Sequence, residues 1–278
     1  MIFRALIVLC LIWGCNFVVM KVANAYFTPE LFVTYRFLSG AAVLLAVAFF
    51  TKLPPPPRKF WGWIVLSGFF QIAAGSVILQ NCFKYLDAGL TSVVNYTMPL
   101  WVTLLAAIFL HEPLTRKKIV GVALSIVGVG VLMNVDVSGE LPAILMALTA
   151  AICWAVGNVI MKAKLSECNT ISLTTWQMAV GAVMLAIYTA AFIETSVTWT
   201  PLGIVCLLYN GILASAIAFI LWVFVLQHME ASKASISILG VPVVSVVAGV
   251  LLLGEPLTLS IVLGMLMVLA GIFIVQHS

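Results

Sequence analysis

Aromatic and amide side chains stand together inside the most hydrophobic segments of this chain. Trp13, Asn16 and Met20 lie at helical spacing, so one face of a helix carries all three. An indole beside an amide offers a stacking surface and a hydrogen-bonding group, which suits a small polar or zwitterionic solute. Tryptophan near a helix end is often an interfacial anchor, which is the alternative interpretation. A second set of the same character comprises Trp154, Asn158 and Met161.

Two prolines indicate helix breaks at matching places in two apolar segments. Pro99 and Pro242 each lie about half-way along a segment, where proline removes the bond to the carbonyl four residues earlier. In lipid, a broken helix persists where its freed groups meet protein or water, so the breaks point to a site. Ser92, Asn95 and Tyr96 lie beside the first break and are candidate contacts. The alternative is a packing kink with hydroxyl groups bonding between helices.

Four further polar side chains lie within apolar segments. Amides and phenols are costly there unless they face a partner or a water-filled cavity. Each is therefore a candidate substrate contact. They are Gln71, Asn81, Tyr209 and Asn210.

Two cationic side chains are predicted to lie within helices. Lys21 and Arg36 fall in the outer halves of the first two apolar segments. Arg36 could pair with a carboxylate in the outer vestibule, and both are candidate contacts for an anionic group. The alternative is that both side chains extend to the outer headgroups, as long basic side chains commonly do.

The acidic and histidine side chains occupy positions that disfavour catalysis. All nine acidic residues and all three histidines lie at the ends of predicted helices or in loops, so none is expected at membrane depth to carry a proton. The six cysteines include no CxxC pair and no zinc-ligand spacing. The sequence therefore predicts no catalytic residue, no metal site and no cofactor. It disfavours a proton-coupled multidrug pump, an intramembrane aspartyl protease and a metal-dependent membrane enzyme.

The elements that position these side chains are predicted to be membrane-spanning helices. The chain of 278 residues is 64% hydrophobic and 8% charged, with a mean hydropathy of +1.24, which a water-facing surface does not sustain. A helix needs roughly 20 apolar residues to cross the hydrocarbon, and the alternation of a transmembrane barrel is absent. We predict an all-α polytopic membrane protein with ten transmembrane helices. They cover residues 3–23, 31–50, 60–85, 88–110, 118–133, 141–162, 171–193, 201–227, 231–253 and 259–275.

One pattern occurs twice along the chain. Trp13 and Lys21 recur 141 residues later, and the run Glu-Pro-Leu-Thr that begins at Glu112 recurs 143 residues later. Each copy holds five predicted helices, and this odd number makes the second copy enter from the opposite face of the bilayer. We therefore predict two inverted five-helix repeats, residues 1–138 and 139–278, around a central cavity. Inverted repeats are typical of secondary transporters.

Basic residues predict the orientation, because short cytoplasmic loops hold an excess of Lys and Arg. With the N-terminus inside, only Lys84 falls in an outer loop, so both termini are expected in the cytoplasm. The net charge of +4 reflects this orientation and implies no nucleic-acid partner. The cytoplasmic segments then hold Arg4, Lys52, Arg58, Lys59, Arg116, Lys117, Lys118, Lys162, Lys164 and Lys233.

Several of these patterns together resemble a known family. They are the run from Trp13 to Lys21, Arg36 between tyrosine and phenylalanine, Pro99, the run from His111 to Thr115, and the glycines at 121 and 128. The chain is similar over its whole length to the EamA-type branch of the drug/metabolite transporter superfamily. The resemblance implies ten helices, a central cavity between two inverted halves, and alternating access by rocking of the halves. The second copy departs from the first by placing Gln177 where Arg36 stands.

The favoured function is transport across the bacterial inner membrane of a small polar metabolite, as export of an amino acid or a derivative. The partners expected are this small molecule and the lipid bilayer, and the sequence does not distinguish a monomer from a dimer. One alternative is uptake or exchange of a larger solute, such as a nucleotide sugar or a drug-like compound. The phosphates of a nucleotide sugar would need several cationic side chains in the cavity to balance their charge, and only Lys21 and Arg36 are candidates. A second alternative is a non-transporting membrane enzyme or scaffold.

Overall fold

The computed structural model describes residues 2–133, 141–238 and 240–276. The predicted boundary between the repeats, at residue 138, lies outside the described residues. The described part of the chain is almost entirely helical, with an isolated antiparallel bridge between Phe27 and Val197.

Ten helical spans follow one another along the described chain, in the order predicted. Eight of them are long and apolar enough to cross a membrane, and the helices α7 and α14 complete the ten. The first five spans are α1 (Ile2–Ala23), α2 (Pro29–Phe50), the composite span Arg58–Cys82, the composite span Ala88–Phe109 and α7 (Arg116–Met133). The last five are α8 (Leu141–Lys164), α9 (Thr170–Phe192), the composite spans Pro201–His228 and Ala231–Leu253, and α14 (Leu259–Gln276).

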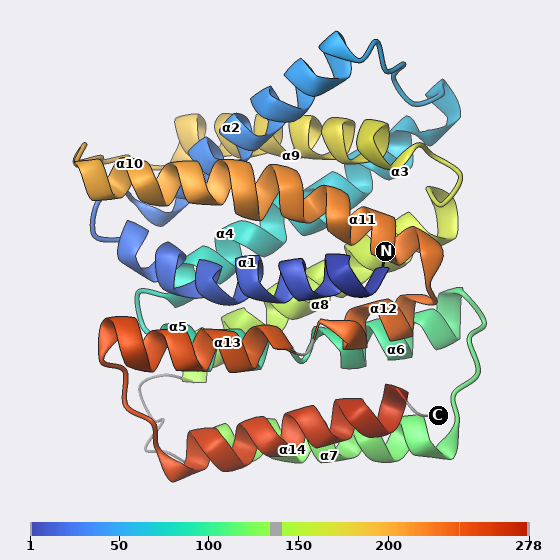
Figure 1. Cartoon of the computed structure of the whole chain (residues 1–278), viewed down its shortest axis with the longest axis vertical. Coiled ribbons are helices and arrows are strands. Elements are labelled where there is room, and N and C mark those ends of the chain that lie inside the picture. Colours follow the sequence, from blue (N-terminus) through green and yellow to red (C-terminus); the bar gives the residue numbers. More distant parts are fainter. Residues whose placement is uncertain (1, 134–140, 239, 277–278) are drawn as a thin grey trace.

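The two sets of five spans run in opposite directions. Figure 1 shows α1 leaving the end of the molecule at which the N- and C-termini lie, whereas α8 runs back toward that end. The pairing of helices is also reciprocal between the sets. Helix α2 packs on α9, α7 packs on α14, α1 packs on the ninth span and α8 packs on the fourth span. The fold is therefore a pair of inverted five-helix repeats.

Four of the spans are interrupted, and the interruptions correspond between the repeats. The third span consists of η1 (Arg58–Phe60), α3 (Trp61–Gly68), the π-helical segment η2 (Phe69–Ala74) and α4 (Gly75–Cys82), in that order. The eighth contains the π-helical segment η3 (Tyr209–Ile217) between α10 (Pro201–Leu208) and α11 (Ala218–His228). Short π-helical segments inside α-helices often mark functional sites.

The proline breaks begin earlier than the sequence predicts. Helix α5 (Ala88–Asn95) ends before Tyr96, and Pro99 lies in the first turn of α6 (Met98–Phe109). Helix α12 (Ala231–Ser237) likewise ends before α13 (Gly240–Ala248), which contains Pro242 and leads into η4 (Gly249–Leu253). Proline is tolerated in a first helical turn because no intrahelical N–H bond is needed there. Each proline thus lies in the first turn of a new helix, α6 or α13.

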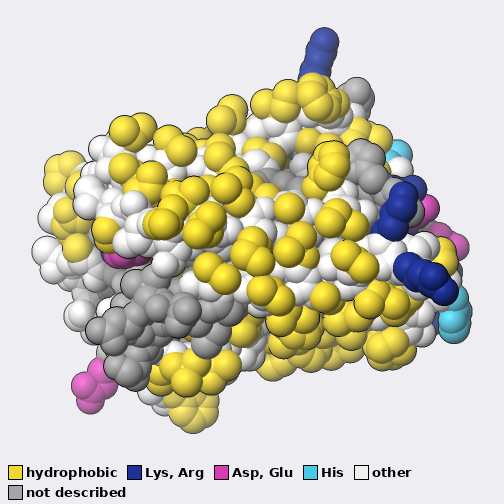
Figure 2. Space-filling model, turned by 90° about the horizontal axis from the view of Figure 1, so that it is seen from below, with side chains coloured by type: hydrophobic (Ala, Val, Ile, Leu, Met, Phe, Trp, Pro, Cys, Tyr) yellow, Lys and Arg dark blue, Asp and Glu magenta, His cyan; other side chains and the backbone are white. Residues whose placement is uncertain are grey.

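The outer surface matches a lipid environment. Figure 2 shows apolar side chains across the middle of one face, with basic and histidine side chains gathered at the end where the termini lie. Large apolar residues such as Phe3, Phe49 and Phe192 are exposed. In water such a surface would be costly, whereas in a bilayer it faces hydrocarbon.

Helices α7 and α14 pack closely because glycines of both repeats meet at their interface. A methyl group built on Gly271 would lie 2.3 Å from the carbonyl oxygen of Gly121, and one on Gly128 would lie 2.9 Å from that of Gly264. Small residues let helices approach in this way within membranes, where packing rather than the hydrophobic effect drives association.

We expect Gly271→Ala to lower the thermal stability of the purified protein in detergent. Overpacking of this kind typically costs about 1–3 kcal/mol. Gly62→Ala is the matched control, because nothing lies within 4 Å of a methyl group at Gly62 and this position is also helical. Equal melting temperatures for the two variants would contradict the close packing of α7 and α14.

Candidate functional site

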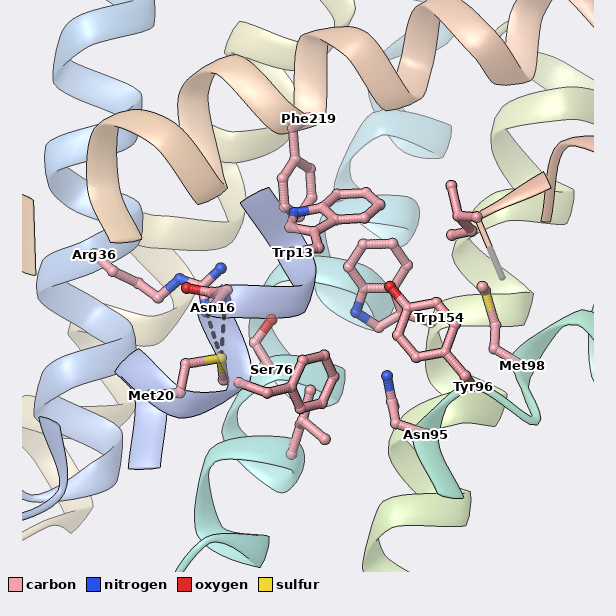
Figure 3. Close-up of a pocket in the computed structure, with 13 residues that line it drawn as sticks. Trp13, Asn16, Met20, Arg36, Ser76, Asn95, Tyr96, Met98, Trp154 and Phe219 are labelled. Atoms are coloured by element: carbon pink, nitrogen blue, oxygen red, sulfur yellow. Dashed lines mark hydrogen bonds between the residues drawn. The ribbon is translucent and has the colours of Figure 1, made fainter. Parts of the chain in front are cut away.

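A pocket lies between the repeats at the point where the broken helices meet α1 and α8 (Figure 3). The volume open to the centre of a water molecule is about 50 Å³, which is room for a few waters. Six of its lining residues are among the predicted substrate contacts, and Arg36 is a seventh predicted residue. The lining comprises Trp13, Asn16, Phe17, Met20, Arg36, Ser76, Leu79, Asn95, Tyr96, Met98, Trp154, Phe219 and Ile238.

Aromatic rings form one wall of the pocket. The ring centroids of Trp13 and Trp154 are 5.6 Å apart with the planes at 89°, and Phe219 lies 5.5 Å from Trp154. Trp13 is fixed by a bond of 3.1 Å from its indole N–H to the carbonyl of Ala214. Edge-to-face contacts of this kind are favourable and hold rings in defined orientations. The two repeats therefore build one rigid aromatic surface.

Arg36 carries the one positive charge among the residues that line the pocket. Its side chain is buried, at 5% relative exposure, so it does not extend to the headgroups as the alternative interpretation held. The guanidinium donates from Nε to Ser215 Oγ at 3.1 Å and from one terminal nitrogen to the sulfur of Met20 at 3.4 Å. Among the described residues, no carboxylate lies within 4.0 Å of Arg36. An always-charged group is thus buried beside neutral partners alone.

Two side-chain carbonyl groups of the pocket also lack partners. The oxygens Oδ1 of Asn16 and Asn95 are buried and accept no hydrogen bond within the described structure. Asn16 uses its amide N–H on Met20 at 3.1 Å. Leaving a buried acceptor unpaired costs about 1–3 kcal/mol. In Figure 3, Arg36, Asn16 and Met20 lie together on one side of the pocket, and Asn95, Tyr96 and Met98 lie on the other.

Gln71 and Asn158 form a hydrogen-bonded network outside the pocket lining. Gln71 donates to Asn158 Oδ1 at 2.9 Å and accepts from Gln177 at 2.9 Å. The indole of Trp222 donates to the same oxygen of Asn158 at 3.0 Å. Because these amides are buried and bonded to one another, the network joins α8, α9 and the third span behind the aromatic wall.

The other predicted residues also lie outside the lining and bond within the protein. Asn81 donates to Glu30 at 2.9 Å, and Tyr209 donates to the carbonyl of Ile12 at 2.8 Å. The remaining ones bond to backbone or to charged groups, or break a helix without lining the pocket. These are Ser92, Asn210, Lys21, Pro99 and Pro242.

Six lining residues were not singled out by the sequence. Most are apolar and resemble the surrounding hydrophobic chain, so composition carried no signal for them. Phe17 adjoins Asn16 in the sequence, and Ser76 is the one polar residue of the six, so these two had a local signal. The six are Phe17, Ser76, Leu79, Met98, Phe219 and Ile238.

We expect Asn158→Ala to destabilise the protein and Asn95→Ala to leave its stability unchanged. The first change removes the acceptor shared by Gln71 and Trp222, which leaves two buried donors unpaired at about 1–3 kcal/mol each. The side chain of Asn95 has no hydrogen bond to lose within the described structure. The measurement is the melting temperature of each purified variant in the same detergent. Similar melting temperatures would argue against the network.

Comparison with known proteins agrees with this architecture. The profile of the EamA-like transporter family matches residues 2–134 and 141–276. The chain is 32% identical over 274 residues to the uncharacterized transporter YoaV of Bacillus subtilis (strain 168), covering 95% of this chain and 92% of that protein. A solved crystal structure matches with a TM-score of 0.76 at 18% identity, covering 99% of this chain and 97% of the other.

Two further relatives carry more specific names. The chain is 30% identical over 286 residues to a "Probable amino-acid metabolite efflux pump" of Salmonella typhimurium (strain LT2), covering 98% of this chain and 93% of that protein. It is 29% identical over 277 residues to a protein of the same name from Escherichia coli (strain K12), covering 95% and 90%. The fold and these matches define a multi-pass membrane transporter rather than an enzyme. The chain belongs to the EamA-like transporter family.

Proposed function

We propose that this protein exports an amino acid or a closely related zwitterionic metabolite across the bacterial inner membrane by alternating access. The observation that carries the proposal is the buried guanidinium of Arg36, which faces the pocket without a carboxylate among the described residues. Burying a charge is costly unless it is paired. A substrate carboxylate would supply the missing partner through two parallel N–H···O bonds.

The rest of the pocket complements the rest of such a substrate. The unpaired oxygens of Asn16 and Asn95 accept hydrogen bonds, as an ammonium group requires. The rings of Trp13, Trp154 and Tyr96 offer faces to a cation or to an apolar side chain. The names of the two efflux relatives agree with amino-acid metabolites as cargo and with export as the direction.

Charge distribution supports a topology with both termini in the cytoplasm. Basic residues gather at the end that holds both termini (Figure 2), which is the cytoplasmic end by the excess of Lys and Arg in short inner loops. A nucleotide sugar is disfavoured, because its phosphates would need several cations. The lining offers Arg36 alone, and Lys21 is already bonded to Asp87 and Glu255.

We expect Arg36→Gln to reduce counterflow of labelled amino acids in liposomes by about tenfold or more, because a hydrogen bond to a charged group contributes about 1.5–3 kcal/mol. The wild type should also prefer an amino acid to its methyl ester, and this preference should disappear in the variant. Arg58→Gln, at an exposed position, is the matched control. Absence of flux for a full amino-acid panel, or an unchanged preference in Arg36→Gln, would overturn the proposal.

Asn95→Ala is expected to lower the same counterflow by about threefold to tenfold, the equivalent of one hydrogen bond. Its abundance in the membrane should equal that of the wild type, because the side chain has no internal bond to lose. Equal flux in variant and parent, at equal abundance, would remove Asn95 from the set of contact residues.

A further inference from the structure

Three charged side chains join the two repeats at the end of the molecule opposite the termini. Lys21, in the last turn of α1, donates to Asp87 and to Glu255, the latter at 3.1 Å. Lys21 and Asp87 belong to the first repeat, whereas Glu255 belongs to the second. We refer to Lys21, Asp87 and Glu255 as the first triad.

Glu255 also binds the N-terminus of the broken fourth span. Its two carboxylate oxygens accept from the backbone N–H groups of Ala88 at 2.7 Å and of Gly89 at 3.0 Å. The first N–H groups of a helix have no intrahelical partner and carry partial positive charge, so a carboxylate is stabilised there. Asp87, which precedes α5, makes no such cap itself. The second repeat therefore supplies the cap of a pocket-forming helix in the first.

The offset of the repeat places equivalent residues at the opposite end of the molecule. Lys162, Glu230 and Glu112 correspond to Lys21, Asp87 and Glu255, and we refer to them as the second triad. The turns that carry the two glutamates have the same backbone. Glu112 N–H bonds to the carbonyl of Ala106 and Glu255 N–H to that of Gly249, both at 3.2 Å.

The same turns share an unusual conformation. His111 and Gly254 precede Glu112 and Glu255 and have φ of 55° and 66°. The left-handed region is uncommon for a residue such as histidine, so its occurrence at the position equivalent to Gly254 is evidence that the turn geometry is maintained in both repeats. Both glutamates are thus presented in the same way to the opposite repeat.

The second triad is not assembled in this structure. Lys162 donates to the backbone carbonyls of Leu226 at 3.2 Å and Gln227 at 3.5 Å. Glu230 pairs with Lys233 at 3.3 Å, and Glu112 accepts from the hydroxyl of Ser232. Within the described residues no ion pair joins the three members to one another. One end of the pseudo-symmetric molecule is therefore held by ion pairs and a helix cap. At the other end Glu112 already contacts the first turn of α12 through Ser232, the residue equivalent to Gly89, but in the described part of the chain Lys162 makes no ion pair with Glu112 or Glu230.

We propose that the two triads are alternating gates, the first closing the pocket toward the end opposite the termini and the second closing it toward the end of the termini. This inference rests on the alternating access of the proposed function. In the conformation described, the first gate is closed. In the opposite conformation Lys162, Glu230 and Glu112 assemble. Glu112 then moves from the Ser232 hydroxyl to the backbone N–H groups at the start of α12 and caps this helix as Glu255 here caps α5.

Symmetry gives this exchange its energetic basis. Each state makes one complete triad and one helix cap and leaves the other set partly engaged, as Glu112 is here through Ser232, so the two states differ little in free energy. A substrate can then shift the equilibrium with the small difference in affinity that it has for the two states. Partial exposure of Lys21 and Asp87 keeps the pairing modest in strength, which allows the gate to open.

The test measures access to the pocket without any substrate, so it can succeed or fail independently of the proposed function. The six native cysteines are replaced, and Ser76→Cys in the pocket lining serves as reporter. A membrane-impermeant maleimide is applied from the face of the first triad. Glu255→Gln should raise the labelling rate from this face by roughly threefold to tenfold, and Asp87→Asn should act in the same direction with less perturbation of the helix cap.

Glu112→Gln is the decisive variant, because it weakens the state in which the first gate is open. It should lower labelling from the face of the first triad and raise labelling from the opposite face. Glu194→Gln is the matched control, since Glu194 is exposed in the loop after α9 and forms no ion pair with the described residues. A change of the same sign in Glu255→Gln and Glu112→Gln, or no change in Glu112→Gln, would overturn the proposal and leave the first triad as a static clamp.

Discussion

The structure depends on the requirement that polar groups buried from water must find partners. Helices satisfy the backbone of each span internally, and the exceptions lie where spans are broken or where charges are buried. At the start of the fourth span the first N–H groups of α5, which have no intrahelical partner, are bonded by Glu255 from the other repeat. In the pocket this requirement is not met within the described structure, because Arg36 has only neutral hydrogen-bond partners and the side-chain oxygens of Asn16 and Asn95 accept no hydrogen bond. Among the described residues, buried oxygens without a partner also occur outside the pocket, on Gln177 and Asn210 for example, so it is the unpaired charge of Arg36 that distinguishes the pocket from the scaffold.

The two repeats share a fold but differ at the position that gives the site its charge. Arg36 of the first repeat faces the pocket, whereas its equivalent, Gln177, donates to Gln71 within a neutral amide network. A symmetric pair of arginines would place two uncompensated charges between the repeats. With one, the pocket has a cationic side and an aromatic side (Figure 3), an asymmetry that matches the zwitterionic substrate proposed above.

Much of the fold could be predicted from hydrophobic segments and the repeat, because both are one-dimensional patterns. All ten predicted spans correspond to helical spans of the structure. The helix breaks were predicted at the prolines, but α5 already ends at Asn95 and Pro99 lies in the first turn of α6, because proline fits the first turn of a new helix. Among the candidate polar residues, Asn16 and Asn95 line the pocket while Gln71 and Asn158 do not. Equal polarity and equal membrane depth made these amides indistinguishable in the sequence.

The sequence by itself determined the membrane-spanning helices, their number and their inverted order. The length and hydropathy of the segments indicate the helices, and a repeat with an odd number of helices makes the second copy inverted. Only the tertiary structure decided which polar side chains are partners of one another. Whether Lys21 is a substrate contact or a link between repeats depends on Glu255, which is 234 residues away along the chain. Such pairing depends on how helices distant in sequence pack together, and no local pattern encodes that distance.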